Sequence, residues 1–130
     1  MEKTCPFCNW EKPPLLMNSL AVAIYDKYPV TQGHTLIIPR RHYSDFFESN
    51  KEESDAILSL HWEAKGLLDT RHRPDGYNVG INCGVPAGQT IPHFHVHLIP
   101  RYRGDIEDPR GGIRGVIPAK QKYPSFTLPV

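Results

Sequence analysis

Several features that would assign a chain quickly to a class are missing from this sequence. Charge of one sign is not in excess, since 15 basic and 14 acidic residues leave a net charge of +1. That balance gives no general electrostatic reason to bind nucleic acid or a membrane surface. No apolar run approaches the ~20 residues that span a bilayer, and the N-terminus lacks the basic-then-apolar pattern of a signal peptide. We therefore expect a cytoplasmic protein without nucleic-acid or membrane partners.

Cysteine is also scarce. Three cysteines are too few, and odd in number, for a disulfide scaffold. The length of 130 residues allows one buried core and leaves no room for a second. We expect a single domain over residues 1–130, with an irregular N-terminal arm at 1–18 and a Gly/Pro-rich tail at 102–130.

The apolar pattern predicts four strands and one long helix. The helix begins at Asn50, which with Glu53 forms a capping-box pattern, and it ends before Pro74. Its inward positions recur at helical spacing, at Ile57, Leu60, Ala64 and Leu67/Leu68. Short apolar or alternating runs predict strands at 20–25, 34–38, 77–82 and 93–99. The order favours an α+β fold, an antiparallel sheet meander with the helix packed on one face.

Three histidines dominate the last of these strands, at His93, His95 and His97. Side chains alternate between the faces of a strand, so the three imidazoles would share one face, spaced by roughly 7 Å. Phe94, Val96 and Leu98 would pack on the other face. Imidazole can act as nucleophile, acid or base, phosphate donor or metal ligand near neutral pH. The alternatives are a chance histidine-rich strand or a simple metal-binding tract.

The segment from His93 to Ile99 has the pattern His-φ-His-φ-His-φ-φ, with φ an apolar residue. It is accompanied, in order along the chain, by Gly33-His34, Asn82 and Gly88-Gln89-Thr90. Together these elements resemble the histidine triad family of nucleotide hydrolases and transferases, which act at the α-phosphate of a nucleotide. The resemblance runs from about Cys5 to Arg101.

Chemistry and resemblance suggest the same mechanism. His95 would attack the α-phosphorus to form a covalent nucleotidyl-histidine, which water then releases as a nucleoside monophosphate. His97 would donate to the phosphate or the bridging oxygen. By resemblance, Gln89 binds phosphate and Thr90 contacts the leaving group. His34 has a family counterpart near the back wall of the site, and we expect it to support the site through a hydrogen bond.

Two further polar residues end strands, where they could contact the nucleotide. The resemblance puts Asp26 on the ribose hydroxyls, although an aspartate there could equally open a turn. Asn82 suits a sugar or phosphate contact, or could only cap its loop. Val22 and Ile24 could floor a base pocket, but core packing explains them equally well.

The pair Cys5 and Cys8 is ambiguous by itself. No βαβ context follows it, so a thioredoxin-like redox pair is not supported. A structural zinc site needs two further ligands. A subset of the resembled family completes such a site with a histidine after the second strand and the first triad histidine, which implies His42 and His93 here. A reduced, metal-free pair is the alternative.

The substrate and the assembly are expectations drawn from the resemblance. It favours a purine nucleotide, as a dinucleoside polyphosphate, and a homodimer that meets through the long helix and a sheet edge. A nucleoside phosphoramidate or acyl adenylate donor, phosphorolysis in place of hydrolysis, and a non-catalytic nucleotide-binding module remain open. In the tail, Arg101, Arg103, Arg110 and Arg114 could hold the extra phosphates of a polyphosphate, or form only a solvated basic tail.

Overall fold

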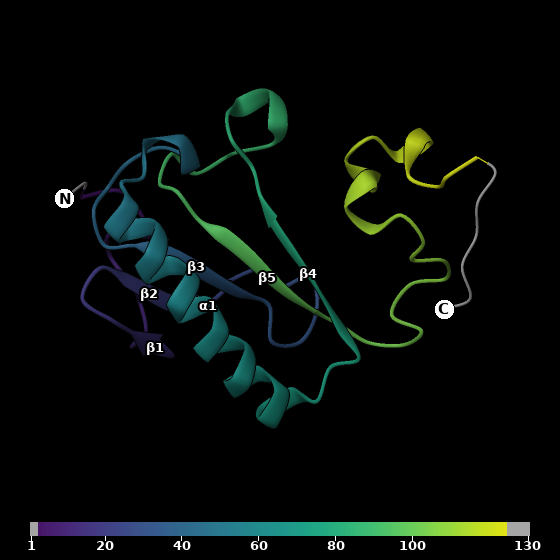
Figure 1. Ribbon diagram of the computed structural model, residues 1–130, viewed down its shortest axis with the longest axis horizontal. Coiled ribbons are helices and arrows are strands. Elements are labelled where there is room, and N and C mark those ends of the chain that lie inside the picture. Colours follow the sequence, from purple (N-terminus) through teal and green to yellow (C-terminus); the bar gives the residue numbers. More distant parts are fainter. Residues whose placement is uncertain (1–2, 125–130) are drawn as a thin grey trace.

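One long helix and a five-stranded antiparallel sheet form the two layers of the fold, which the computed structural model describes over residues 3–124 (Figure 1). The helix is α1 (Lys51–His72). The strands are β1 (Leu16–Met17), β2 (Ala21–Tyr25), β3 (Thr35–Pro39), β4 (Gly76–Ile81) and β5 (Val96–Arg101). Short 3-10 turns are η1 (Phe46–Glu48), η2 (Val85–Ala87), η3 (Gly112–Val116) and η4 (Pro118–Lys120). The predicted α+β class is confirmed.

Local sequence signals determine where α1 begins and ends. The Asn50 side chain accepts a hydrogen bond from the Glu53 backbone N–H at 2.8 Å, and the Glu53 carboxylate accepts from the Asn50 N–H at 3.1 Å. This is the predicted capping box, which satisfies two backbone donors at the helix start. The helix ends at His72, and Arg73 takes a left-handed conformation (φ 49°) just before Pro74. The helix therefore has the bounds that its capping residues predict.

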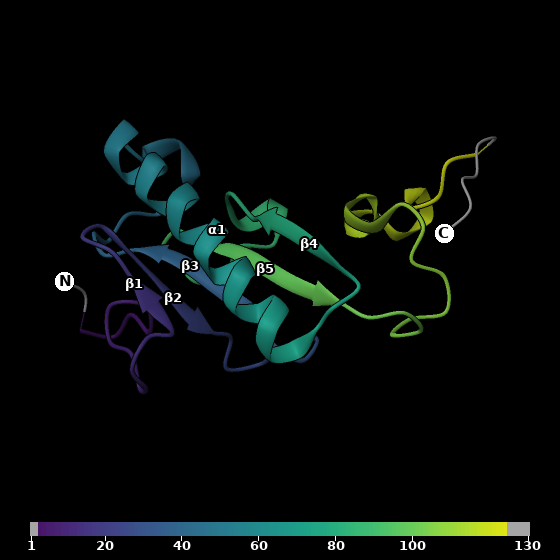
Figure 2. The ribbon, with the colours of Figure 1, turned by 60° about the horizontal axis from the view of Figure 1, so that its bottom comes forward.

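The two faces of the sheet bury different clusters. Under α1 lies the larger core, which includes Phe94, Val96 and Leu98, as the alternation predicts. On the opposite face, Phe7 and Trp10 of the N-terminal arm pack against a smaller cluster of Val22, Leu36 and Ile38. Figure 2 shows the helix on one side of the sheet and the N-terminal arm on the other. The arm thus covers the face that α1 leaves free.

Strand order departs from chain order at one point. The order across the sheet is β1-β2-β3-β5-β4, so β5 is inserted between β3 and β4 and β4 forms an edge. The sequence did not predict β1, which pairs with β2 at one edge of the sheet. On its other side β2 pairs with β3 as a hairpin. The connection between β2 and β3 turns at Gly33 (φ 89°), where a side chain would overlap the His72 ring. Glycine is required there for both its conformation and its size.

The described residues after β5 do not extend away as a loose chain. They lie to the side of β4 in Figure 1, and residues of η3 contact this strand. Ile113 of η3 lies over Gly80. A side chain at position 80 would have its Cβ 3.6 Å from the Ile113 Cδ1. No helix within residues 3–124 combines the length and the hydropathy needed to cross a membrane.

Candidate functional site

The triad histidines lie at the entrance of β5 rather than along it. The strand begins at Val96, so only His97 is a strand residue. Before it, the Phe94 backbone N–H donates to the Tyr43 carbonyl at 2.7 Å instead of joining the sheet. The rings of His95 and His97 are therefore closer than a regular strand predicts, with centroids 5.1 Å apart. The expected strand over 93–99 is wrong in its first three residues, where the Phe94 N–H bonds to the segment after β3.

His95 is held in one orientation and one tautomer. It is 7% exposed, and its Nδ1 lies 2.8 Å from the carbonyl oxygen of His93. A carbonyl can only accept, so Nδ1 carries the proton and, in the neutral ring, Nε2 keeps its lone pair. The edge contact of Phe7, with ring centroids 4.9 Å apart, supports the ring from the arm. In its neutral form, His95 therefore presents an unprotonated Nε2, as a nucleophile requires.

A chain of hydrogen bonds fixes the tautomer of His97 as well. The Val30 backbone N–H donates to His34 Nδ1 at 3.1 Å, so the proton of neutral His34 must lie on Nε2. That nitrogen is 2.9 Å from His97 Nδ1, which accepts. The proton of neutral His97 is therefore on Nε2. Asp26 Oδ2 lies 3.4 Å from His34 Nε2, beside this pair.

Burial keeps these two rings uncharged near neutral pH. Desolvation lowers the pKa of His34, opposed by the carboxylate of Asp26. Desolvation, followed by the neighbouring rings of His95 and His34, lowers the pKa of His97 to about 4. A neutral His97 is a hydrogen-bond donor through Nε2–H and not a cation. The pair can offer one aligned proton without placing a charge beside His95.

The loop from Asn82 to Pro92 is braced by Gln89. The Gln89 Oε1 accepts from the Gly84 N–H at 2.8 Å, and its Nε2 donates to the carbonyls of Ser44 (2.6 Å) and Ile91 (3.0 Å). The side chain is buried, and these partners occupy its amide. In this structure Gln89 shapes the loop instead of facing outward to a phosphate. Thr90 is exposed next to it.

The other expected contacts with the nucleotide lie at strand ends. Asn82 follows β4 and is half-buried. Asp26 follows β2, and its Oδ1 accepts from the Tyr28 N–H at 2.8 Å, which is the turn-opening role considered above. Its second oxygen remains directed at the His34–His97 pair. Asp26 therefore combines a turn with a position beside the histidines.

Cys5, Cys8, His42 and His93 come together as a four-residue cluster. One ligand atom from each lies within 4.8 Å of all the others. The Cys8 Sγ is 3.3 Å from His42 Nδ1 and 3.5 Å from His93 Nδ1, and the two Nδ1 atoms are 3.1 Å apart. Tetrahedral zinc with its usual Zn–N and Zn–S bonds requires ligand separations of about 3.3 to 3.8 Å. The cluster could hold a metal ion with only small adjustments.

The ring of His93 is oriented for such a site. Its Nε2 lies 2.9 Å from the Pro39 carbonyl oxygen, to which it donates, so Nδ1 has the free lone pair. A backbone carbonyl on the second nitrogen is the usual support of a metal-bound histidine. Burial also raises the pKa of the Cys5 thiol, so a bound cation would have to displace its proton. The donor set therefore fits zinc with four protein ligands.

Sequence reasoning missed two features of the site. Phe7, between the two cysteines, contacts the rings of both His93 (centroids 6.0 Å apart) and His95. An apolar residue inside the Cys-x-x-Cys was the available signal. The second feature is that two of the tail arginines are used within the fold. Arg101 is paired with Asp105, and Arg114 bonds to carbonyls within the tail.

Comparison with known proteins agrees with this arrangement. The family model of the HIT domain matches residues 12–104. An uncharacterised HIT-like protein of Mycoplasma genitalium is 39% identical over 104 residues, which is 76% of this chain and 74% of that protein. The AP-4-A phosphorylase of Mycobacterium tuberculosis is 34% identical, over 66% of this chain and 45% of its own. The asymmetrical bis(5'-nucleosyl)-tetraphosphatase of Schizosaccharomyces pombe is 32% identical, over 68% and 49%. The match thus spans less than half of each of these two enzymes.

Solved structures share the fold. A HIT family protein from Bacillus anthracis superposes with a TM-score of 0.72 at 32% identity, covering 83% of this chain and 82% of that one. A Zn-bound histidine triad family protein from Mycobacterium smegmatis has a TM-score of 0.68 at 31% identity, with 78% of both chains covered. The family model, the relatives and the site geometry lead to one conclusion. The protein is a member of the histidine triad (HIT) family.

Proposed function

We propose that the protein is a hydrolase that cleaves a dinucleoside polyphosphate at its α-phosphate through a nucleotidyl intermediate on His95. The observation that carries the proposal is the 2.8 Å bond from His95 Nδ1 to the His93 carbonyl, which leaves Nε2 as a nucleophile. Two relatives are named for reactions of nucleoside tetraphosphates, which supports this substrate class. We expect a purine base, as the resemblance implies.

In the first step, His95 Nε2 would form a bond to the α-phosphorus while the bond to the bridging oxygen breaks. The electron pair leaves with that oxygen, which carries the remaining phosphates. His97 would donate its Nε2–H to the departing oxygen or to the phosphate, and His34 holds His97 in the required tautomer. Water would then attack the phosphorus, releasing the nucleoside monophosphate and restoring His95.

The nucleotide itself would lie along the face that bears the three histidines. Asp26 beside the His34–His97 pair supports a contact with the ribose hydroxyls, and Ile24 with the arm residue Phe7 offers apolar surface for a base. We keep Asn82 and Thr90 as contacts to the phosphate or leaving group. For Gln89 we propose the indirect role of positioning Thr90, because its own amide is occupied.

The metal would be a structural zinc held by Cys5, Cys8, His42 and His93. Four protein ligands close the tetrahedron, so such an ion would hold the arm in place and leave no open position for substrate. The Zn-bound relative from Mycobacterium smegmatis supports the choice of metal. We retain one domain over 1–130, with the arm at 1–18 fixed by the metal and the tail beginning at 102.

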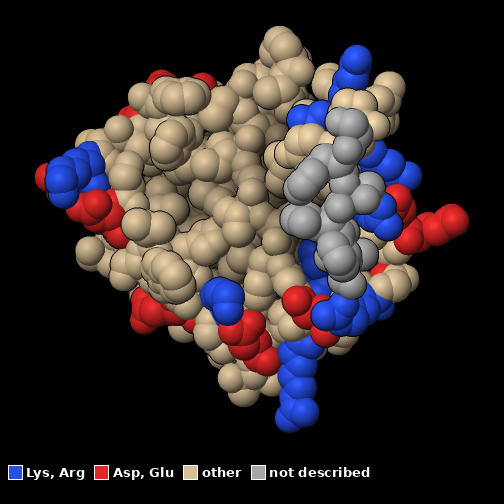
Figure 3. Space-filling model, turned by 45° about the vertical axis from the view of Figure 1, so that its right-hand side comes forward, with Lys and Arg blue, Asp and Glu red and all other residues tan. Residues whose placement is uncertain are grey.

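A homodimer is the assembly that the surface favours. β4 is an edge strand, and its Val79 and Ile81 are 49% and 38% exposed on the side of α1, where Trp62 is 70% exposed. Figure 3 shows a face whose centre has no charged side chain, with Lys, Arg, Asp and Glu gathered at its margins. Exposed apolar side chains beside an edge strand are suited to an isologous contact. Sedimentation equilibrium of wild type and Trp62→Glu would test this homodimer. Separately, we retain the cytoplasm as the expected location.

Phosphorolysis is the second candidate, and the phosphorylase relative is the specific reason to keep it. It shares the His95 intermediate and differs only in the acceptor of the second step. Three alternatives remain to be tested alongside these two. They are hydrolysis of a nucleoside phosphoramidate, hydrolysis of an acyl adenylate, and nucleotide binding without catalysis. All enzymatic candidates require His95, whereas the binding module does not.

The deciding experiment is product analysis with wild type and His95→Ala. Diadenosine tetraphosphate and adenosine phosphoramidate would be incubated separately, with and without inorganic phosphate. We expect AMP and ATP from the tetraphosphate, dependent on His95. Formation of ADP and ATP only when phosphate is present would establish phosphorolysis instead. Tight nucleotide binding with no turnover of either compound would contradict the enzyme proposal and support the binding module.

A further inference from the structure

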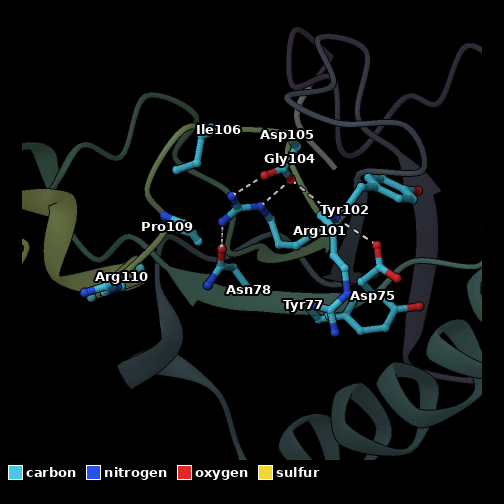
Figure 4. A pocket seen from close by; sticks show the side chains of 14 residues that line it. Asp75, Tyr77, Asn78, Arg101, Tyr102, Gly104, Asp105, Ile106, Pro109 and Arg110 are labelled. Atoms are coloured by element: carbon cyan, nitrogen blue, oxygen red, sulfur yellow. Dashed lines mark hydrogen bonds and ion pairs between the residues drawn. The ribbon is translucent and has the colours of Figure 1, made fainter. Parts of the chain in front are cut away.

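A cavity whose lining includes several charged side chains lies at the end of the β4–β5 pair that is far from the histidines, between these strands and the tail. Its volume is about 450 Å³, within the range of small-molecule sites (Figure 4). We call it the tail pocket. The lining residues that bear on its chemistry are Asp75, Asn78, Arg101, Arg103, Asp105 and Arg110.

Arg101 and Asp105 form the fixed floor of the tail pocket. The Arg101 Nε and Nη2 donate to the two carboxylate oxygens of Asp105 at 2.8 and 2.7 Å, and Nη1 donates to Asn78 Oδ1 at 2.6 Å (Figure 4). The guanidinium lowers the pKa of Asp105 strongly, so this pair stays ionised. Each charge has its partner, and neither is available to neutralise a ligand.

Two other arginines line the pocket without such partners. Among the described residues, Arg110 has only a loose ion pair, with Nε 3.7 Å from Asp108 Oδ1. Within residues 3–124, the Arg103 guanidinium makes no hydrogen bond or ion pair, although its backbone N–H donates to Asp75 at 2.8 Å. With Arg101 and Asp105 cancelling, the lining has Arg103 and Arg110 against Asp75. The pocket therefore has cationic groups free to bind an anion.

The wall that carries Arg110 is preformed by the tail itself. Arg114 donates to the carbonyls of Gln121 (3.2 Å) and Lys120 (2.9 Å), and Gln121 Nε2 donates to the Arg110 carbonyl (3.1 Å). The fold of this segment depends on Gly111 (φ 88°), where any side chain would overlap the Gln121 carbonyl. Arg110 is thus displayed by an ordered turn, which reduces the entropy lost when it binds a ligand.

The tail pocket and the histidines lie on the same face of the sheet. Residues of β5 alternate in burial, with His97, Ile99 and Arg101 on the half-buried side. Since a strand rises by about 3.3 Å per residue, Arg101 lies about 13 Å along β5 from His97. An extended tetraphosphate and the side chain of an arginine could together span this distance, whereas a phosphoramidate, which has a single phosphate, could not. The two sites are suited to opposite ends of one extended substrate.

We propose that the tail pocket binds a distal phosphate of the substrate through Arg103 and Arg110, and so selects polyphosphate over shorter nucleotides. The proposal rests on the proposed function in one respect only, namely that the phosphate bound in the tail pocket belongs to a dinucleoside polyphosphate substrate. The pocket's affinity for a polyphosphate anion is independent of any turnover. A free phosphate ion is the other source of the same chemistry, and the experiment separates the two.

The test uses the double variant Arg103→Ala/Arg110→Ala in the full chain, with Arg71→Ala as a control. Arg71 is an exposed cation near the end of α1 and does not line the pocket, so it removes a charge without touching the site. Calorimetric titration with inorganic tripolyphosphate, and separately with orthophosphate, measures binding directly. We expect the double variant to lose about tenfold or more in affinity for tripolyphosphate, as removal of charge-assisted hydrogen bonds implies. Arg71→Ala should bind as wild type does.

Kinetics then connect the pocket to the reaction. The ratio of kcat/KM for diadenosine tetraphosphate to that for adenosine phosphoramidate should fall about tenfold in the double variant, through KM of the tetraphosphate. Equal tripolyphosphate affinity in the double variant and wild type would overturn the proposal, as would an equal loss in Arg71→Ala. Orthophosphate binding that is lost while tripolyphosphate binding is retained would make this a free-phosphate site and overturn it too. If wild type cleaves neither nucleotide, the proposed function fails, and the titration still decides the pocket.

Discussion

Replacement of His34 by alanine is the sharpest test of how the site controls its protons. His34 would not touch the phosphate, but its Nε2–H donates to His97 Nδ1 at 2.9 Å and forces the His97 proton onto Nε2. Without that donor, His97 Nδ1 is an unsatisfied acceptor and the other tautomer becomes accessible. We therefore expect kcat to fall while nucleotide affinity changes little.

The size of the effect follows from the bond that is lost. Leaving one buried acceptor unpaired costs about 1 to 2 kcal/mol, which corresponds to roughly 5- to 30-fold in rate. His97→Ala removes the donor itself and should cost more, on the order of 100-fold or above. His34→Gln, whose amide N–H can replace Nε2–H, should recover part of the loss.

The assays are single-turnover rates on diadenosine tetraphosphate and ¹⁵N NMR of the imidazoles. NMR should show His97 protonated at Nε2 in wild type and a mixture of tautomers in His34→Ala. His61→Ala removes another half-buried histidine, on α1, and serves as the control. A wild-type kcat in His34→Ala, or an unchanged His97 tautomer, would refute the reasoning.

Three further predictions concern the metal, the helix start and pH. Freshly purified protein should hold about one zinc per chain by elemental analysis, and Cys8→Ser should lower it; wild type without zinc would contradict the site. Glu53→Ala removes a capping-box carboxylate that also binds the Arg41 guanidinium at 2.8 and 2.9 Å, so urea unfolding should show a loss of about 2 kcal/mol, against little change for exposed Glu52→Ala. The folded pKa of His97, about 4, lies below the ordinary 6.5, so the unfolded chain binds more protons in that window and stability should fall as pH drops from 6.5 to 4. Partial exposure reduces the ideal value to about 1 to 2 kcal/mol, and a pH dependence unchanged in His97→Gln would contradict the assignment.

The elements of the fold were predictable wherever their signals are local. Asn50 and Glu53 cap the helix within three residues of each other, and Pro74 ends it, so neighbours in sequence suffice. The alternation of apolar residues around the triad likewise predicted that Phe94 and Leu98 face the core. Each of these depends on the backbone of one segment alone.

Contacts between segments that are distant in the chain could not be predicted from the sequence in the same way. Whether β5 lies beside β3 or beyond β4 depends on contacts between Ile37 and Val96, which are 59 positions apart in the chain. The burial of Gln89 depends on the carbonyl of Ser44, and no property of the glutamine itself signals that partner. Within residues 3–124, the difference between Arg101 and Arg114, which bond within the fold, and Arg103, whose guanidinium does not, has the same cause. The sequence predicts that polar groups gather near the site, but only packing decides which of them remain available to a ligand.

The three triad histidines illustrate this principle most clearly. Their side chains are identical, but the partner that binds one ring nitrogen decides what the other nitrogen can do. His93 bonds through Nε2 to Pro39 and directs Nδ1 to the metal cluster, whereas His95 bonds through Nδ1 and directs Nε2 outward. His97 accepts from His34 and becomes a donor at Nε2. The carbonyl that fixes His95 belongs to His93 itself, so the same residue that would bind the metal also orients the nucleophile. The proposed metal site and the proposed nucleophile would therefore be coupled through one backbone group, and a metal that holds the arm would also stiffen the ring of His95.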